Sequence, residues 1–459
     1  MLFDDGVSDY DYDNIFVFQP LESSLLRSLS LFPGMQNVSQ KRLFFDYYLE
    51  RVCPRTTASS KSASPFASVI LPFCMTASPT LFKAIQALGA CHWARFNSSY
   101  NAVGLQLKSS ALHDLRFRLE TEGFSSCSTD SEVLVVIMML CLCEIVDNCD
   151  KRWTIHLKGA KELIRFKRQQ RMGLLSSSSS SSSSSYSSSS SSSPSPSPTP
   201  LAIIQSQQDP VSVFTESFFA FQDVIGRTAC GEEVLFGSDY WQDHDRVVDL
   251  WMGCSPELVS ILSSITEMSR TRRLLSTDAA RSSFSQQAAL LAHRLESLKQ
   301  EVADSDDVEL ETTAELKRLA AILYLHCALY GASPSTPLVV EYVRRILQLV
   351  SGLVDRGSVV SVTWPVFVAA AELDPIHDEL WSEPGGEAVT YGRPLILQAL
   401  AAMERSTVSS IARTRAVIAQ IWHARDLDLL KGGESGRDPM TCNDWEWHVA
   451  PISSAMSLA

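Results

Sequence analysis

The stretch RWTIHLKGAKELIRFKR, residues 152–168, decides which fold this sequence predicts. Apolar side chains and one histidine recur in it at steps of three and four residues, which is the spacing of one face of an α-helix. The residues on this face are Trp153, His156, Leu157, Ala160, Leu163 and Ile164. We expect a helix that packs this face against other helices. We also expect the small residues Gly159 and Ala160 to let a neighbouring helix approach closely.

The basic residues of the same stretch lie off the apolar face: Lys158, Lys161, Arg165 and Arg168. Two interpretations are open, a face turned to solvent or a set of contacts to nucleic-acid phosphates. Runs of charge usually mark exposed faces. The chain also carries 39 basic and 52 acidic residues, a net charge of −13, and such a field opposes binding to DNA. We therefore expect these side chains to face water.

Helical spacing also marks three segments that precede this stretch. Residues 79–96 follow a serine and begin with a proline, a pair that favours a helix start. The expected buried face of this segment consists of Leu81, Ile85, Leu88 and His92. In residues 104–120 the expected face consists of Leu105, Leu112, Leu115 and Leu119. Residues 130–146 are apolar all round, which predicts a central helix covered by others.

Helices are predicted over most of the remaining chain, and alternating β-patterns are scarce. The predicted ranges are residues 210–228, 256–269, 282–302, 312–330, 337–354, 363–372, 394–405 and 407–424. The sequence therefore predicts an all-α fold, a large helical domain of stacked antiparallel helix pairs.

A serine-rich segment interrupts this pattern. Residues 176–200 are almost wholly serine, followed by Ser-Pro and Thr-Pro steps, and they offer no apolar surface to offset the entropy of ordering. We expect a partly disordered acidic and aromatic segment at 1–40, a first helical part at 41–175, a disordered linker at 176–209 and a second helical part at 210–459. Phosphorylation of the linker is left open by its composition.

The N-terminal stretch DYDYDNIFVFQPLE, residues 9–22, mixes Asp with aromatic and aliphatic residues. This pattern is typical of disordered activation segments, but it also suits a terminus that docks Phe16 and Phe18 on the helical domain. The terminus is acidic, unlike a signal peptide, and the longest apolar run, residues 133–143, is too short to cross a bilayer. We expect a reducing, intracellular setting without membrane contact, in which the eleven cysteines act as buried hydrophobes.

Four common catalytic and phosphate-binding motifs do not occur in the sequence: the P-loop, the dinucleotide-binding glycine motif, the nucleophile elbow and H-E-x-x-H. The cysteines closest to a metal cluster are Cys141, Cys143 and Cys149. They lack C-x-x-C spacing, and the first two point about 200° apart on a helix. We therefore expect no metal ligand among them.

Two acid–histidine groups also deserve a test for cation binding or acid–base chemistry. They are Asp239, Asp243, His244 and Asp245, and Asp374, His377, Asp378 and Glu379. Neither group has a nucleophile or a glycine-rich loop beside it, so exposed loop and helix-start positions account for them better. We expect no enzyme and no catalytic or cofactor-binding residue, and the sequence names no ligand-binding residue.

Seven segments share an order along the chain that is specific to one family. They are RLFFDYYLERVCP (42–54), SPFASVILPFCMTASPTLFKAIQALGACHWARF (64–96), VLVVIMMLCLCEIVDNCDKRWTIHLKGAKELI (133–164), FFAFQDVIGRTACGEEVLFGSDYW (218–241), WPVFVAAAE (364–372), IWHARD (421–426) and DWEWHVA (444–450). Together they resemble the fungal-specific transcription factor domain family, the helical regulatory region of zinc binuclear cluster regulators. The resemblance covers about residues 41–449.

The resemblance implies a nuclear regulator of genes transcribed by RNA polymerase II, with the transcription machinery or co-regulators as partners and homodimerisation left open. Family members usually carry an N-terminal cluster of six cysteines, which folds around two zinc ions and enters the major groove of DNA. Here the first cysteine is Cys53, and the basic residues of the first fifty are Arg27, Lys41 and Arg42. Either an upstream exon is missing, and zinc is expected only with it, or the chain contacts DNA only indirectly. The alternative is a helical scaffold or adaptor that acts through protein partners alone.

Overall fold

The computed structural model describes residues 39–147, 152–179, 209–230, 233–237, 240–241, 245–272, 274–376, 378–382, 389–430 and 456–458. Most of these residues are helical, and the strands among them form one two-stranded sheet. The prediction of an all-α fold is confirmed. Residues 1–38 of the expected acidic and aromatic segment and residues 180–208 of the expected linker lie outside the described residues.

The first helical part consists of long helices joined by short helical turns. Its elements are α2 (Ser39–Tyr47), η1 (Tyr48–Val52), η2 (Cys53–Thr56), η3 (Phe66–Ile70), α3 (Leu71–Cys74), α4 (Pro79–Ala94), η4 (Ser98–Tyr100), α5 (Asn101–Thr129), α6 (Ser131–Asp147) and α7 (Arg152–Ser179). The predicted start of α4 is confirmed, because the hydroxyl of Ser78 accepts a hydrogen bond from the Thr80 amide at 3.2 Å and Pro79 occupies the first turn.

The second helical part stacks consecutive helices against one another. Its elements are α9 (Pro210–Cys230), α10 (Pro256–Arg272), α11 (Asp278–Ser297), α12 (Val308–Leu325), η6 (His326–Tyr330), α13 (Pro337–Asp355), α14 (Thr363–Ala371), β1 (Glu379–Ser382), β2 (Val389–Tyr391), α15 (Gly392–Ser406) and α16 (Ala412–Leu430). Helices α10 to α14 each contact the next one along the chain. Strands β1 and β2 pair in antiparallel fashion.

Three of the helices predicted in this part have boundaries that are wrong by several residues. Helix α12 begins at Val308 instead of 312, and helix α16 ends at Leu430 instead of 424. Helix α11 begins at Asp278, where Thr277 caps its first turn through the Ala280 amide, instead of at 282, and it ends at Ser297 instead of 302. Helix α16 begins at Ala412 instead of 407. The Thr407 hydroxyl bonds back to Met403 at 2.9 Å, so it closes α15 rather than opening the next helix.

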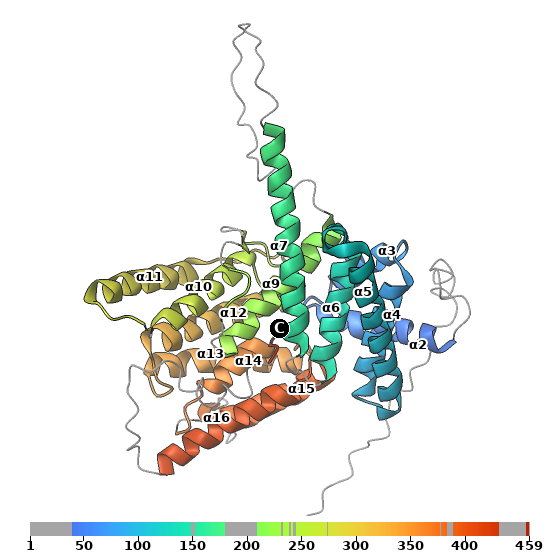
Figure 1. The fold of residues 1–459 in the computed structure, drawn as a ribbon. Helices are drawn as coiled ribbons and strands as arrows, with labels where there is room; N and C mark the ends of the chain where they lie inside the picture. The colour runs from blue at the N-terminus through green and yellow to red at the C-terminus, as the bar shows by residue number, and fades with distance from the viewer. Residues whose placement is uncertain are drawn as a thin grey trace, which may run out of the picture.

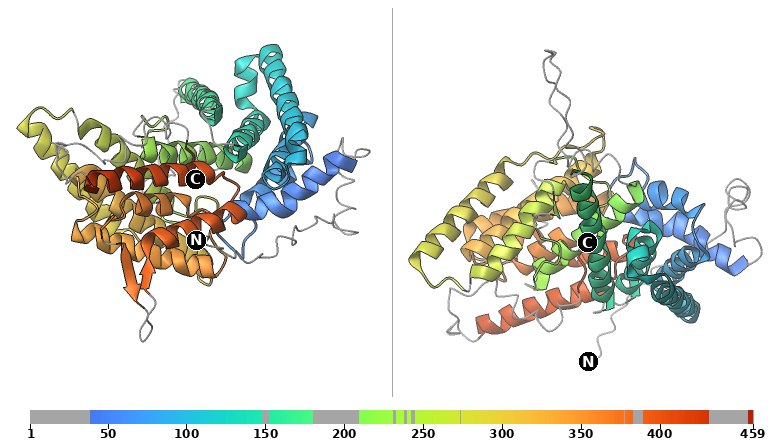
Figure 2. Two further views of the ribbon diagram at one scale, coloured as in Figure 1. Left: turned by 90° about the horizontal axis from the view of Figure 1, so that it is seen from below. Right: turned by 45° about the horizontal axis from the view of Figure 1, so that its top comes forward.

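Helix α6 lies at the centre of the molecule. Its residues from Val133 to Val146 are buried throughout, and α4, α5, α7 and α9 contact it. Figure 1 shows α7 standing between the group α2–α6 and the group α10–α14, and both views of Figure 2 agree with this arrangement. The prediction of a covered apolar helix over residues 130–146 is confirmed.

The apolar face of α7 points into the same core. Trp153, Leu157, Ala160, Leu163 and Ile164 are all buried, as the spacing predicts. The expected close approach at Gly159 is wrong, since a Cβ built there meets nothing within 4 Å. The close approach lies on the partner helix α9 instead. A Cβ at Gly226 would come within 3.1 Å of the Trp153 indole.

The buried face of α5 differs from the predicted one. Of the expected residues, Leu115 is buried, but Leu105 is 52% exposed, and Gly104, Lys108 and Ala111 are buried instead. The reason is electrostatic, because the Lys108 ammonium lies 3.3 Å from the Glu144 carboxylate of α6. A prediction of the buried face from apolar residues alone leaves out a buried cation such as Lys108. The predicted face is then rotated away from the true one. Of the other expected residues, Leu112 and Leu119 are half-buried against the core.

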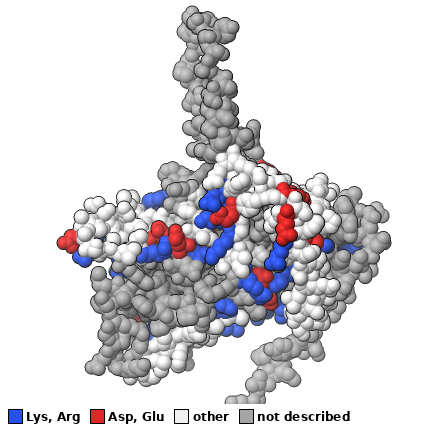
Figure 3. All heavy atoms as spheres, viewed as in Figure 1, with Lys and Arg blue, Asp and Glu red and all other residues white. Residues whose placement is uncertain are grey.

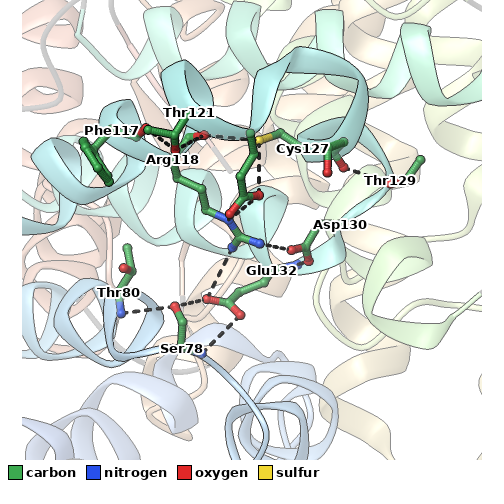
Figure 4. Close-up of polar contacts among 11 residues, drawn as sticks. Ser78, Thr80, Phe117, Arg118, Thr121, Cys127, Thr129, Asp130 and Glu132 are labelled. Carbon is green, nitrogen blue, oxygen red and sulfur yellow. Dashed lines mark hydrogen bonds and ion pairs between the residues drawn. The ribbon is translucent and has the colours of Figure 1, made fainter.

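An ionic junction joins the starts of α4 and α6 to the middle of α5 (Figure 4). The Arg118 guanidinium contacts three carboxylates, those of Glu122 at 3.1 Å, Asp130, and Glu132 at 3.8 Å. Glu132 in turn accepts hydrogen bonds from the amide of Ser78, at 3.1 Å, and from its hydroxyl. Arg118 and Glu132 thereby fix the starts of α4 and α6 relative to α5, which supports the N-terminal layer of the fold.

Candidate functional site

The basic face of α7 lies on the surface, as predicted. Lys158, Arg165 and Arg168 are exposed and Lys161 is half-buried. Carboxylates are interleaved with these cations: Glu162 lies 2.6 Å from the Arg165 guanidinium. Figure 3 shows the same mixture of acidic and basic side chains across the described part of this side of the molecule. A face of mixed sign attracts phosphates much less than a basic stripe would.

The end of the quoted stretch contains a cation that the sequence analysis missed. Lys167 is buried, and its ammonium lies 2.8 Å from the Ser212 hydroxyl and 3.5 Å from the Glu216 carboxylate. The exposed Arg168 reaches the same carboxylate at 3.2 Å. The signal was present in the sequence, because Lys167 follows Ile164 by three residues and so continues the buried face.

Arg168 also holds the segment that follows α9. Its guanidinium lies over the ring of Tyr240, 4.3 Å from the centroid, a cation–π contact. Tyr240 meets Phe236 edge to face at 5.5 Å, and Phe236 is buried in the main core. Helix α7 therefore positions residues 233–237 from one side.

Asp223 of α9 positions residues 233–237 from the other side. One of its carboxylate oxygens accepts hydrogen bonds from the amides of Leu235, at 2.5 Å, and Phe236, at 2.8 Å. The other oxygen accepts from Arg227 at 3.2 Å. Burial raises the pKa of the Asp223 carboxyl, and these hydrogen bonds and the Arg227 charge act in the opposite direction. The segment is thus held through its backbone amides as well as through the buried Phe236 side chain.

Between this segment and two helices lies a groove of about 640 Å³, which we call the α10–α11 groove. Its lining residues are Glu233, Val234, Gly237, Ser263, Ser264, Glu267, Met268, Gln287, Leu290, Leu291 and Arg294. They come from residues 233–237, from α10 and from α11. The volume lies within the range of roughly 300–1,000 Å³ typical of small-molecule sites.

The acid–histidine groups do not form sites in the part of the chain that the structure describes. Asp239, Asp243, His244 and His377 lie outside it. Asp245 accepts a hydrogen bond from the Val247 amide at 3.2 Å, Asp374 from the Ile376 amide at 2.9 Å and Asp378 from the Arg393 amide at 2.9 Å. Glu379 is exposed at the start of β1. Asp245 and Asp374 therefore close turns, and Asp378 holds the start of α15.

The two described cysteines of the expected cluster face different neighbours. The Cys141 thiol lies 3.7 Å from the Trp153 carbonyl oxygen of α7, whereas the Cys143 thiol meets that of Cys91 on α4, and burial raises the pKa of Cys143. Cys149 lies outside the described residues. Within the described ranges no three His, Cys, Asp or Glu side chains are grouped to hold a metal ion.

None of the described helices combines the length and the apolar character that crossing a bilayer requires.

No curated protein and no solved structure shows significant similarity to this chain. Residues 42–459, however, match the family described as the fungal specific transcription factor domain. This match covers most of the chain and includes both helical parts. The chain therefore belongs to the fungal-specific transcription factor domain family.

Proposed function

We propose that this fungal transcription regulator acts in the nucleus on genes transcribed by RNA polymerase II, and that its helical body works through protein partners. The observation that carries the proposal is the family match over residues 42–459. The partners are the transcription machinery or co-regulators. Membership of a regulatory-domain family also supports a non-enzymatic role.

The way the body reaches DNA is part of the proposal. The sequence contains no C-x-x-C spacing, the spacing with which zinc clusters begin, and the exposed cations of α7 are interleaved with carboxylates. The net charge of −13 also opposes direct contact with phosphates. We therefore propose that the residues of this chain contact DNA only indirectly, through a second module or a partner, and hold no cofactor of their own.

A tethered reporter tests the proposal. The chain is fused to an unrelated DNA-binding module, and expression is read from a reporter that carries the module's sites. We expect a several-fold change in expression relative to the module alone. A fusion carrying Phe218→Asp, which places a charge in a fully buried position, should lose the effect. If neither the chain nor any of its fragments changes expression, the proposal is wrong.

A scaffold or adaptor without any DNA-binding module is the second candidate. The observation that favours it is that the first cysteine of this sequence is Cys53, whereas family members usually carry six cysteines in an N-terminal zinc cluster. The genomic sequence upstream of Met1 separates the two candidates. An in-frame exon with C-x-x-C spacing and a basic run favours a DNA-bound regulator, and its absence favours the adaptor.

A further inference from the structure

We propose that Cys91 and Cys143 form an oxidisable thiol pair, in which hydrogen peroxide oxidises Cys91 and a disulfide with Cys143 then joins α4 to α6. The proposal concerns thiol chemistry alone, so it is tested independently of transcription. Three observations support it: the contact between the two thiols, the access to Cys91, and the charges beside it.

The two thiols meet where α4 packs against α6, the central helix. They form a hydrogen bond with each other. Cys141, two residues earlier on α6, faces α7 instead, since its thiol lies 3.7 Å from the Trp153 carbonyl oxygen. A disulfide has a sulfur–sulfur bond of about 2 Å. Because Cys91 and Cys143 already face each other, forming this bond requires only a local approach of two helices that are in contact.

Cys91 is the accessible member of the pair. It is half-buried, whereas the other seven described cysteines, Cys143 included, are buried. The space beside its sulfur exists because residue 104 of α5 is a glycine: a Cβ at Gly104 would come within 3.2 Å of the Cys91 sulfur. Thiol oxidation selects exposed sulfurs with thiolate character. A small oxidant therefore reaches Cys91 first.

The surroundings give the two sulfurs different roles. The hydrogen bond with Cys143 is the largest cause that lowers the pKa of the Cys91 thiol, and the Lys108 ammonium lowers it as well. Burial and the carboxylates of Asp147 and Glu144 act in the opposite direction, but the pKa of Cys91 remains below its usual value. Burial raises the pKa of Cys143. Cys91 therefore supplies the nucleophilic thiolate, and Cys143 keeps its proton until the second step.

Cys53 and Cys74 show the contrast with an inert pair. They lie near enough for the charge of Cys53 to raise the pKa of Cys74. Both are buried, and burial, the largest cause for each, raises the pKa of each thiol to about 12. At neutral pH both sulfurs are protonated thiols, which are poor nucleophiles. Proximity alone therefore does not make a pair oxidisable.

The reaction balances in two steps. The Cys91 thiolate attacks one oxygen of hydrogen peroxide, and the oxygen–oxygen bond breaks to leave a sulfenic acid and hydroxide. The hydroxide takes up the proton that Cys91 released and becomes water. The Cys143 sulfur then attacks the Cys91 sulfur, the sulfur–oxygen bond breaks, and the hydroxyl leaves with the Cys143 proton as a second water. The two thiols lose two electrons in total, and the peroxide gains them.

Peptide mass spectrometry of the full chain tests the proposal. The reduced chain is treated with hydrogen peroxide, the remaining thiols are blocked with N-ethylmaleimide, and the cysteine peptides are read one by one. We expect a Cys91–Cys143 disulfide that dithiothreitol reverses. At the dose that forms it, Cys53, Cys74 and Cys254 should be oxidised at least about tenfold less, because burial raises the pKa of each of these thiols.

Three variants assign the roles within the pair. Cys143→Ala blocks the second step, so Cys91 should accumulate as a sulfenic acid that dimedone traps. In Cys91→Ala, Cys143 should remain reduced. The matched control is Cys254→Ala, which removes another fully buried cysteine and should form the disulfide like the unmodified chain. Circular dichroism verifies the fold of all three.

The unmodified chain decides the proposal even where a variant fails to fold. The proposal is overturned if peroxide produces no Cys91–Cys143 disulfide in that chain, or produces it only at doses that oxidise Cys53, Cys74 and Cys254 equally. A folded Cys143→Ala chain whose Cys91 yields no dimedone adduct would also overturn it.

Discussion

His92 links the stability of this fold to pH. The residue lies on α4, is fully buried, and its Nδ1 atom lies 3.0 Å from the Tyr47 hydroxyl. Burial, the largest cause, and the nearby charges of Arg95 and Arg55 together lower the pKa of His92 to about 3. The imidazole is therefore neutral in the folded chain at neutral pH, whereas in the unfolded chain it titrates near its usual pKa of 6.5.

Between pH 3 and pH 6.5 the unfolded chain binds a proton at His92 that the folded chain does not. The free energy of unfolding therefore rises with pH in this window, by about 2 kcal/mol between pH 5 and pH 7 from this group alone. Replacing His92 with Phe should remove that part of the slope, whatever it does to stability at pH 7. Urea unfolding at both pH values measures it. Equal slopes in the two proteins would contradict the assignment.

Glu144 has the opposite dependence. Burial alone would raise its pKa, but the hydrogen bond with His156 and the charges of Lys108 and Arg152 outweigh burial and hold the pKa below its usual value. The stabilisation from this carboxylate is thus present above about pH 4.5 and is lost as the pH falls through the lowered pKa.

Glu144→Gln should lower the free energy of unfolding at pH 7 by about 1–3 kcal/mol, because it leaves the buried Lys108 with a weaker partner. The loss should shrink as the pH falls through the lowered pKa of Glu144, because the unmodified carboxylate then also becomes protonated. Glu162→Gln is the control: its pair with Arg165 is exposed, so a change of under about 0.5 kcal/mol is expected. Denaturant unfolding of both variants at pH 7 and pH 3.5 measures the effect. A loss no larger than that of the control would contradict the role of Glu144.

At the scale of the helix, the same substitution should have opposite effects in α4 and α7. A Cβ at Gly89 would lie 2.3 Å from the backbone oxygen of Phe44 in α2, whereas a Cβ at Gly159 meets nothing within 4 Å. Gly89→Ala should therefore destabilise the chain by about 2 kcal/mol or more, since two helix backbones must separate. Gly159→Ala should stabilise it by about 0.5–1 kcal/mol through helix propensity.

Thermal unfolding of these two variants beside the unmodified chain gives the signs directly. A Gly89→Ala chain as stable as the unmodified one would show that α2 and α4 are farther apart than the structure places them. A destabilising Gly159→Ala would show that this part of α7 is covered.

Helices could be predicted from the sequence where burial follows apolar spacing. The faces of α4, α6 and α7 were predicted correctly, because their buried residues are almost all apolar. The face of α5 and the depth of Lys167 were not, because both depend on carboxylates from other helices, Glu144 and Glu216. Helical spacing places Lys167 on the buried face of α7, but it carries no information on the carboxylates that pair with Lys108 and Lys167. Helix ends were displaced where capping side chains, such as Thr277 and Thr407, decide the boundary.

At the scale of the whole molecule, the all-α architecture followed from helical spacing and the family from the order of the segments, but the α10–α11 groove could not be predicted from the sequence. Its lining comes from residues 233–237, from α10 and from α11. These segments meet because Asp223 and Arg168 hold the first of them in place. The lining residues form no recognisable sequence motif. Taken by itself, the exposed Leu290 is an ordinary surface leucine. Only the three-dimensional arrangement brings them together.

The central claim is that this chain regulates transcription, and rapid depletion of the chain in the fungus that encodes it tests the claim most directly. The chain is tagged for induced degradation, and nascent RNA is sequenced within minutes, before secondary effects develop. The account predicts that a defined set of RNA polymerase II transcripts rises or falls at once and recovers when the chain is restored. Unchanged nascent transcription at every gene after complete depletion would contradict it.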